Sequence, residues 1–186
     1  MTAGPLLVEL RGAAPVVERG AWLAANVVLA GRVTVRAGAS IWFGAVLRAE
    51  EGQIEVGPDA NIQDNCVLHT DDGLHLSVGR NTSVGHGAVL HGCTIGEDVV
   101  VGMGSRVLNG ARVGSESLLA AGAVVLEGSE APARSLLAGV PAKVRGELDR
   151  ERIEGLRENG RIYQRLRDEY LAAQPVDYGD AAVDVP

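Results

Sequence analysis

Residues 95–125 read IGEDVV VGMGSR VLNGAR VGSESL LAAGAV V, with an aliphatic side chain at every sixth position. These positions are Ile95, Val101, Val107, Val113, Leu119 and Val125. A small or β-branched residue follows four positions after each of the first five: Val99, Ser105, Ala111, Ser117 and Ala123. A period of six fits neither the two-residue alternation of an ordinary strand nor the 3.6-residue period of an α-helix. The stretch therefore predicts a repeat architecture in which each unit contributes one large and one small inward side chain.

The same register extends upstream to Val17. From Val17 the six-residue steps continue without a break to Leu47. The next step, to Val56, contains three extra residues, and the step to Val78 contains four. The step that ends at Ile95 is one residue short. Three six-residue units form one triangular coil, so the eighteen units ending at Val125 predict about six coils, with parallel strands stacked about 4.8 Å apart. We predict an all-β fold over residues 1–145, a single-stranded left-handed parallel β-helix of hexapeptide repeats.

A different pattern follows the repeat, which we expect to end after Val125 and to lead through a crossing segment into a helix. Apolar residues at helical spacing predict a C-terminal α-helix packed on the β-helix over residues 146–173. They are Ile153, Leu156, Ile162 or Tyr163, Leu166 and Tyr170. Gly160 is expected to interrupt this helix. Residues 174–186 are acidic and flanked by proline, and we expect a disordered tail there.

The composition agrees with a narrow prism. Hydrophobic residues make up 46% of the 186 residues, aromatic residues only 3%, and there are 25 glycines for the many corners. A net charge of −7 without Lys/Arg clusters argues against a nucleic-acid partner, and no apolar run is long enough for a membrane span. Without a signal-peptide pattern, we expect a cytoplasmic protein with free thiols. Cys66 falls in a small inward slot, and Cys93 is expected to pack or to form a turn.

Three of the four histidines gather in the repeat register. His69 and His91 each follow an inward leucine and lie one coil apart, and Arg48 extends their column by one coil. His86 lies on the preceding side of the prism and cannot join them closely within one chain. A catalytic zinc site takes three imidazole nitrogens and a water. The register therefore predicts a metal site in which His86 of the partner subunit completes the His69–His91 pair.

Polar residues accompany His86 on its side of the prism. Gln63 lies in the segment NIQDN with Asn61 and Asp64, and its amide could orient a metal-bound water. Asn61 and Asp64 could equally form a polar cap of the corner. His75, in the inserted stretch TDDGLHL, is outside the column, and we predict that it is a loop residue.

Three segments resemble the γ-class carbonic anhydrase-like hexapeptide-repeat family. They are SIWFGAVLRAE (40–50), ANIQDNCVLHT (60–70) and VGHGAVLHGCTIGEDVVVGMGS (84–105). The similarity covers roughly residues 10–170. The short loop after His69 and the exit motif LLAGVPAKVR are nearest the branch with phenylacetate-degradation and carnitine-operon proteins.

The resemblance implies a homotrimer with metal at each subunit interface. It assigns His69 and His91 as ligands from one subunit and His86 as the ligand from its neighbour. It also assigns Gln63 beside the metal-bound water, with Asn61 as a nearby polar residue. Arg48 matches a family arginine that pairs across the interface with an acidic residue two positions on.

The sequence departs from the family pattern at Leu136-Leu137, where an aromatic residue is often found, and at two places near the proposed site. The usual Arg-Gly-Asp reads Arg48-Ala49-Glu50, which keeps the acidic charge of the pair but adds a methylene. Glu51 offers a second carboxylate, for which a solvated turn is the expected place. The family's prototype enzymes carry an acidic loop with a glutamate proton shuttle after the first histidine, where this chain has only residues 70–73, TDDG.

The resemblance implies a metal-dependent lyase in which a metal-bound hydroxide reversibly hydrates CO₂ to bicarbonate, with weak turnover because the shuttle is missing. Zn²⁺ is the expected ion, and Fe²⁺ or Co²⁺ fit the same ligands. Three alternatives remain open. The first is a metal-dependent thioesterase acting on acyl-CoA. The second is a hexapeptide-repeat acyltransferase with one histidine as general base, and the third is a catalytically silent metal-binding trimer.

Overall fold

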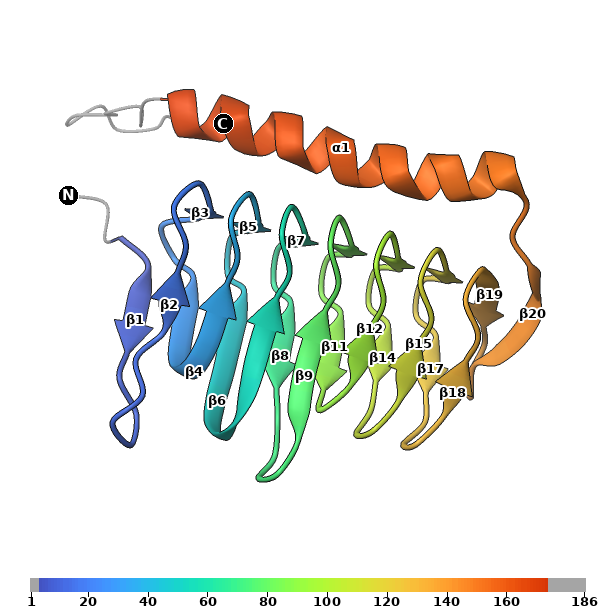
Figure 1. Cartoon of the computed structure of the whole chain (residues 1–186), viewed down its shortest axis with the longest axis horizontal. Coiled ribbons are helices and arrows are strands. Elements are labelled where there is room, and N and C mark those ends of the chain that lie inside the picture. Colours follow the sequence, from blue (N-terminus) through green and yellow to red (C-terminus); the bar gives the residue numbers. More distant parts are fainter. Residues whose placement is uncertain (1–3, 174–186) are drawn as a thin grey trace, which may run out of the picture.

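The computed structural model describes residues 4–173 as a parallel β-helix with one long C-terminal helix along its side (Figure 1). Strands of successive coils stack into three flat faces. The first face contains β1 (Leu6–Val8), the first parts of β4 (Val28–Val35) and β6 (Val46–Val56), β8 (Val67–His69), β11 (Val89–His91), β14 (Arg106–Val107) and β17 (Val124–Val125). The second face contains β2 (Val16–Val17), the remaining parts of β4 and β6, β9 (His75–Val78), β12 (Thr94–Ile95), β15 (Arg112–Val113) and β18 (Glu130–Ala131).

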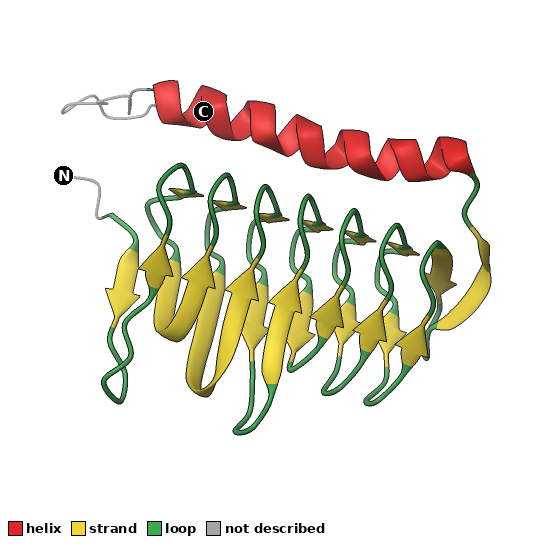
Figure 2. Cartoon of the chain, viewed as in Figure 1, coloured by secondary structure: helices red, strands yellow, loops and turns green. Residues whose placement is uncertain are grey.

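The third face is a separate eight-stranded sheet that lies beneath the helix (Figure 2). It contains β3 (Trp22–Leu23), β5 (Ser40–Ile41), β7 (Asn61–Ile62), β10 (Ser83–Val84), β13 (Val100–Val101), β16 (Leu118–Leu119), β19 (Ser135–Ala138) and β20 (Lys143–Glu147). Neighbouring strands in all three faces pair in parallel, except that β20 turns back antiparallel to β19. The all-β prediction of a left-handed parallel β-helix with a C-terminal helix is therefore confirmed.

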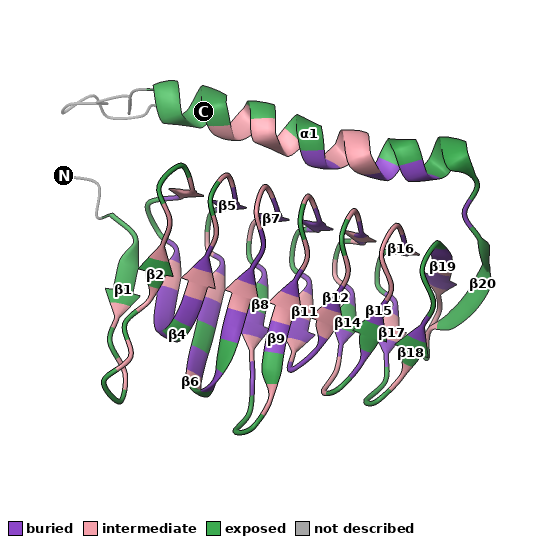
Figure 3. Ribbon diagram, in the orientation of Figure 1, coloured by how far each residue is buried: buried purple, intermediate pink, exposed green. Residues whose placement is uncertain are grey.

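The six-residue period forms the core. Leu68, Leu90, Val107 and Val125 stand in register on successive strands of the first face, and all four are at most 2% exposed. The small residues predicted for the second inward slot are buried as well. Figure 3 shows this alternation as buried segments within every coil. A narrow triangular interior admits one large and one small side chain per side, which explains the scarcity of aromatic residues.

The repeat is one coil longer than expected. The third face has seven parallel strands rather than six, and the register continues from Val125 through Ala131 and Leu137, each six residues on. The predicted end at Val125 is therefore wrong. Ala131 fills the position of the large residue with a methyl group, so the aliphatic pattern weakens although the strand pairing persists.

The C-terminal helix α1 spans Arg150–Ala172 and begins at Asp149, whose side chain accepts a hydrogen bond from the Arg152 backbone N–H at 2.9 Å. It runs back along the third face (Figure 1). Gly160 does not interrupt the helix. It is buried, and a Cβ atom there would lie 2.8 Å from the backbone oxygen of Asn81, so glycine allows close contact with the coil.

Tyr163, and not Ile162, occupies the inward face of α1. The Tyr163 ring packs 5.5 Å from the Trp42 ring, whereas Ile162 is 41% exposed. Ile153 and Leu156 are buried as predicted. The predicted disordered tail, residues 174–186, lies outside the described residues. Within residues 4–173, no helix combines the length and the apolar character needed to cross a membrane.

Three predictions for single residues can be compared with the structure. Cys66 is fully buried in its inward slot, and burial raises the pKa of its thiol to about 11. Cys93 is also buried, with its pKa raised to about 12. Both thiols are free. His75 is an exposed residue of strand β9 and not of a loop, because the inserted stretch returns to the sheet there and pairs with β6.

Candidate metal centre

Arg48, His69 and His91 form one outward column on the first face. The strand register pairs Arg48 with His69 and His69 with His91. Each follows an inward leucine, and successive side chains of a strand point to opposite sides. The repeat register alone therefore stacks these three side chains on the outside of the prism, as the sequence predicts.

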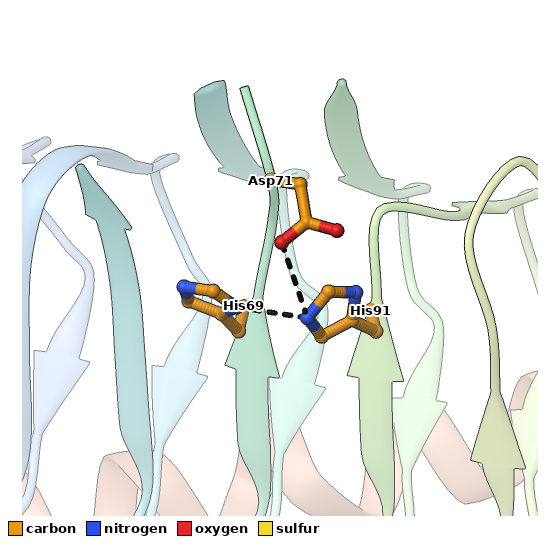
Figure 4. A group of neighbouring side chains, drawn as sticks. All are labelled: His69, Asp71 and His91. Atoms are coloured by element: carbon orange, nitrogen blue, oxygen red, sulfur yellow. Dashed lines mark hydrogen bonds and ion pairs between the residues drawn. The ribbon is translucent and has the colours of Figure 1, made fainter. Parts of the chain in front are cut away.

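The two stacked imidazoles are in direct contact, with His69 Nδ1 2.8 Å from His91 Nε2 (Figure 4). Their other nitrogens face acceptors. His69 Nε2 lies 3.1 Å from Glu50 Oε2, and His91 Nδ1 lies 2.6 Å from Asn109 Oδ1. A carboxylate or an amide oxygen can only accept a hydrogen bond, so these ring nitrogens carry the protons of the neutral rings. The lone pairs of His69 Nδ1 and His91 Nε2 therefore face each other.

The environment also keeps His69 neutral. Burial lowers the pKa of His69 below its ordinary value of 6.5, and the positive charge of Arg48 and the neighbouring His91 lower it further. A neutral imidazole is the form that binds a metal ion. At neutral pH, His69 is thus available as a ligand.

Asp71 brings a carboxylate to the same place. Its Oδ1 lies 3.9 Å from His91 Nε2, and its Oδ2 accepts a hydrogen bond of 2.9 Å from Asn109 Nδ2. One ligand atom from each of His69, Asp71 and His91 lies within 4.8 Å of the other two. Figure 4 shows the three side chains converging from neighbouring coils.

This donor set fits a divalent cation. Lone pairs that face one another without a proton between them are stabilised by a positive ion. Two nitrogens bound at 2.0–2.1 Å to a tetrahedral ion are about 3.3 Å apart, so the imidazoles of His69 and His91 must separate by about 0.5 Å from their present contact. Ring rotation about the side-chain bonds supplies a movement of that size.

His86 is arranged in the same way but elsewhere on the molecule. It lies two residues beyond Val84 at the corner after β10, and its side chain is about half exposed. Its Nδ1 lies 2.9 Å from Asp64 Oδ2, so the carboxylate accepts a hydrogen bond from Nδ1 and Nε2 is the unprotonated nitrogen. The hydroxyl of Tyr163 in α1 lies 3.4 Å from that Nε2. Within one chain, His86 is not part of the cluster that contains His69 and His91.

Gln63 and Asn61 lie with His86. The Gln63 Oε1 atom accepts a hydrogen bond of 3.2 Å from the backbone N–H of His86, and its Nε2 donates to Asn61 Oδ1 at 3.0 Å. Asn61 in turn donates to Ser83 Oγ at 2.8 Å. Both amides are buried. These hydrogen bonds fix the orientation of the Gln63 amide, with Oε1 toward the His86 backbone and Nε2 toward Asn61.

Glu50 connects the remaining predicted residues. Its carboxylate contacts both the Arg48 guanidinium and His69, so within the chain it bridges two members of the column. The extra methylene of glutamate, compared with aspartate, extends the reach of this carboxylate. Glu51 forms an ion pair with Arg11 and not with Arg48 or His69.

Three residues of the centre have no predicted role in it: Asp71, Asn109 and Tyr163. Asp64 lies beside His86 as expected, because Ile62 pairs with Val84 and each of the two residues follows two positions later. Asp71 and Asn109 meet through side chains from different coils, and Tyr163 depends on how the helix docks. The six-residue period contains no signal for these contacts.

Comparison with known proteins agrees with the fold. The family model described as bacterial transferase hexapeptide (six repeats) matches residues 92–127. A solved structure of a hexapeptide transferase family protein from Anaplasma phagocytophilum superposes with a TM-score of 0.84 at 38% identity, covering 89% of this chain and 98% of that chain.

Several curated relatives are named as carbonic anhydrases. A probable carbonic anhydrase of Methanocaldococcus jannaschii is 45% identical over 152 residues, which are 82% of this chain and 96% of that protein. The mitochondrial gamma carbonic anhydrase 1 of Arabidopsis thaliana is 33% identical over 179 residues, covering 92% of this chain and 65% of that protein. With such identity across most of its length, the chain belongs to the γ-class carbonic anhydrase-like family of hexapeptide-repeat proteins.

Proposed function

We propose that this protein is a metal-dependent carbonic anhydrase that reversibly hydrates CO₂ to bicarbonate, with its metal held between the subunits of a homotrimer. The observation that carries the proposal is the state of the three imidazoles. Each has one ring nitrogen held by an acceptor, namely Glu50, Asn109 or Asp64, which leaves the other nitrogen without a proton and able to bind a metal ion. Three neutral imidazoles are the ligand set of a catalytic zinc site.

The proposed interface joins the corner of one subunit to the first face of the next. His86 lies in a corner column with Phe43 two coils before it and Met103 one coil after it; Phe43 is 37% and Met103 57% exposed. On the first face, Val67 lies beside His69 and is 40% exposed. Each half of the proposed site thus has an exposed apolar side chain near it. A contact between two different surfaces closes into a ring when each subunit is rotated by one third of a turn.

A bound Zn²⁺, or Fe²⁺ or Co²⁺ with the same ligands, would lower the pKa of a bound water to about 7 and thereby supply a nucleophile for CO₂ at neutral pH. The residues of the chain prepare the place. Glu50 and Asn109 hold the rings of His69 and His91, and Asp64 holds that of His86. Gln63 Nε2 has a second hydrogen beyond the one given to Asn61, and this hydrogen can orient water or bicarbonate.

The direct test combines metal analysis with an assay of CO₂ hydration. The protein is purified without a histidine tag, and metal content and activity are measured before and after anaerobic metal exchange. We expect one metal ion per chain, and loss of both metal and hydration in His69→Ala. Unchanged metal binding in that variant, or no bound metal in the wild type, would refute the proposal.

A second candidate, CoA-dependent acyl transfer, is favoured by the similarity to a hexapeptide transferase family structure. In that reaction one histidine acts as a general base and needs no metal. Acetyl transfer from acetyl-CoA that withstands a chelator would support this reading. The facing nitrogens of His69 and His91, 2.8 Å apart, favour the metal site instead.

A further inference from the structure

We propose that Asp71 is a metal ligand, so that His69, Asp71 and His91 bind a divalent ion within one chain before His86 of the partner subunit reaches it. The inference rests on the proposed metal site and adds a residue to it. Metal binding would then have two steps: the ion first binds to three residues of one chain, and His86 of the partner subunit binds to it when the interface forms.

The turn after β8 places Asp71 beside the imidazoles. Its backbone C=O accepts a hydrogen bond of 3.2 Å from the backbone N–H of Leu74, which closes the turn. The hydroxyl of the buried Thr70 also donates to the backbone oxygen of Leu74, at 3.1 Å. The position of the Asp71 carboxylate, 3.9 Å from His91 Nε2, thus follows from an ordered turn.

Asn109 from the next coil orients Asp71 and His91 together. Its Nδ2 donates to Asp71 Oδ2 and its Oδ1 accepts from His91 Nδ1. Because Asn109 binds the far atom of each group, the near atoms, Asp71 Oδ1 and His91 Nε2, both lie on the side of His69 Nδ1. Gly92 provides the space, since a Cβ atom there would collide with the Asn109 side chain. Asn109 is thus a positioning residue that acts through the two ligands.

The chemistry of the set supports metal binding without a partner. Two imidazoles and one carboxylate form a ligand set for Zn²⁺ in hydrolases and for non-haem Fe²⁺. The carboxylate adds negative charge close to the cation, which the His69–His91 pair alone does not provide. His86 of the partner subunit would add a fourth ligand, and the water of the proposed reaction would then occupy a fifth position, which Zn²⁺ can accept.

The experiment compares Co²⁺ binding by full-length variants. Affinity is measured by titration calorimetry, and the visible d–d absorption of Co²⁺ reports its ligand geometry. Asp71→Asn removes the charge but keeps an oxygen that can accept from Asn109 Nδ2. Asp72→Asn removes the same charge one residue further along and is the matched control. His86→Ala removes only the ligand offered to the neighbour.

We expect Asp71→Asn to bind Co²⁺ at least about tenfold more weakly, since even partners outside the ligand sphere contribute about 10–100-fold, and to change the d–d band. Asp72→Asn should bind as the wild type does, and His86→Ala should still bind Co²⁺. Wild-type affinity and an unchanged band in Asp71→Asn, or complete loss of binding in His86→Ala, would overturn this inference and leave the three-histidine site intact. Absence of Co²⁺ binding by the wild-type protein would instead overturn the proposed function together with it.

Discussion

Gly160 and Gly155 lie in the same helix, yet we expect replacement by alanine to affect stability in opposite directions. A Cβ atom on Gly155 meets nothing within 4 Å, whereas one on Gly160 would lie 2.6 Å from Asn81 Cγ and 2.8 Å from the Asn81 backbone oxygen. Asn81 cannot give way cheaply. Its Oδ1 accepts a hydrogen bond of 2.9 Å from Gln164, and its Nδ2 donates to Asp98 at 2.7 Å.

The sizes of the competing free-energy terms decide whether each alanine raises or lowers the stability. Alanine is favoured over glycine by about 0.8–1.0 kcal/mol inside a helix, so Gly155→Ala should stabilise the protein by up to about 1 kcal/mol. At Gly160, overpacking costs about 1–3 kcal/mol, and each disturbed hydrogen bond of Asn81 costs about 1 kcal/mol more. We expect Gly160→Ala to destabilise by about 1–3 kcal/mol, despite its gain in helix propensity.

Urea unfolding at equilibrium, followed by circular dichroism at fixed protein concentration, measures both variants. The free energies of unfolding should differ by about 2 kcal/mol or more, with the wild type between them. If both alanines stabilise the protein, the helix does not rest on the coil at Asn81. The contact between Tyr163 and His86 would then lose its structural basis as well.

Three further predictions concern the core, the thiols and the histidine column. Leu90→Ala should destabilise by about 3–5 kcal/mol, because Leu90 is fully buried in a close-packed prism; a loss below about 1 kcal/mol in the same urea assay would contradict the packing. Cys66 and Cys93 should react with a thiol reagent at pH 8 only after unfolding, since burial raises both pKa values far above that pH; rapid reaction of the native protein would show that one thiol is accessible. The pKa of His69 is lowered in the folded state, so the unfolded chain binds the extra proton as the pH falls below 6.5. Stability of the metal-free protein should therefore decrease from pH 7.5 to pH 5.5, and less so in His69→Gln; an equal decrease in both would separate His69 from the effect.

The repeat period predicts more of this protein than its local propensities do. It places Leu68 and Leu90 in the core and, one residue on, His69 above His91, because identical steps along a parallel coil return to the same face. It fails at Ala131, where a strand position is filled by a side chain too small to mark it.

The contacts that complete the centre depend on side chains and helix docking. The Asn109 side chain of one coil donates a hydrogen bond to Asp71 in a turn of another coil. A contact of this kind does not recur every six residues, so the repeat cannot predict it. Tyr163 lies over His86 because Gly160 allows the helix to settle against Asn81. A helical pattern alone does not distinguish Ile162 from Tyr163 as the residue on the inward face.

The shared metal site is the central claim, and subunit complementation tests it most directly. His69→Ala lacks a ligand on the first face, and His86→Ala lacks the ligand at the corner, so each alone should lack CO₂ hydration activity. When the two variants are co-expressed and assemble at random into trimers, about one quarter of the interfaces combine an intact first face with an intact corner. We predict hydration at about one quarter of the wild-type activity per chain in this mixture. Activity no higher than that of either parent would show that the site is not shared between subunits.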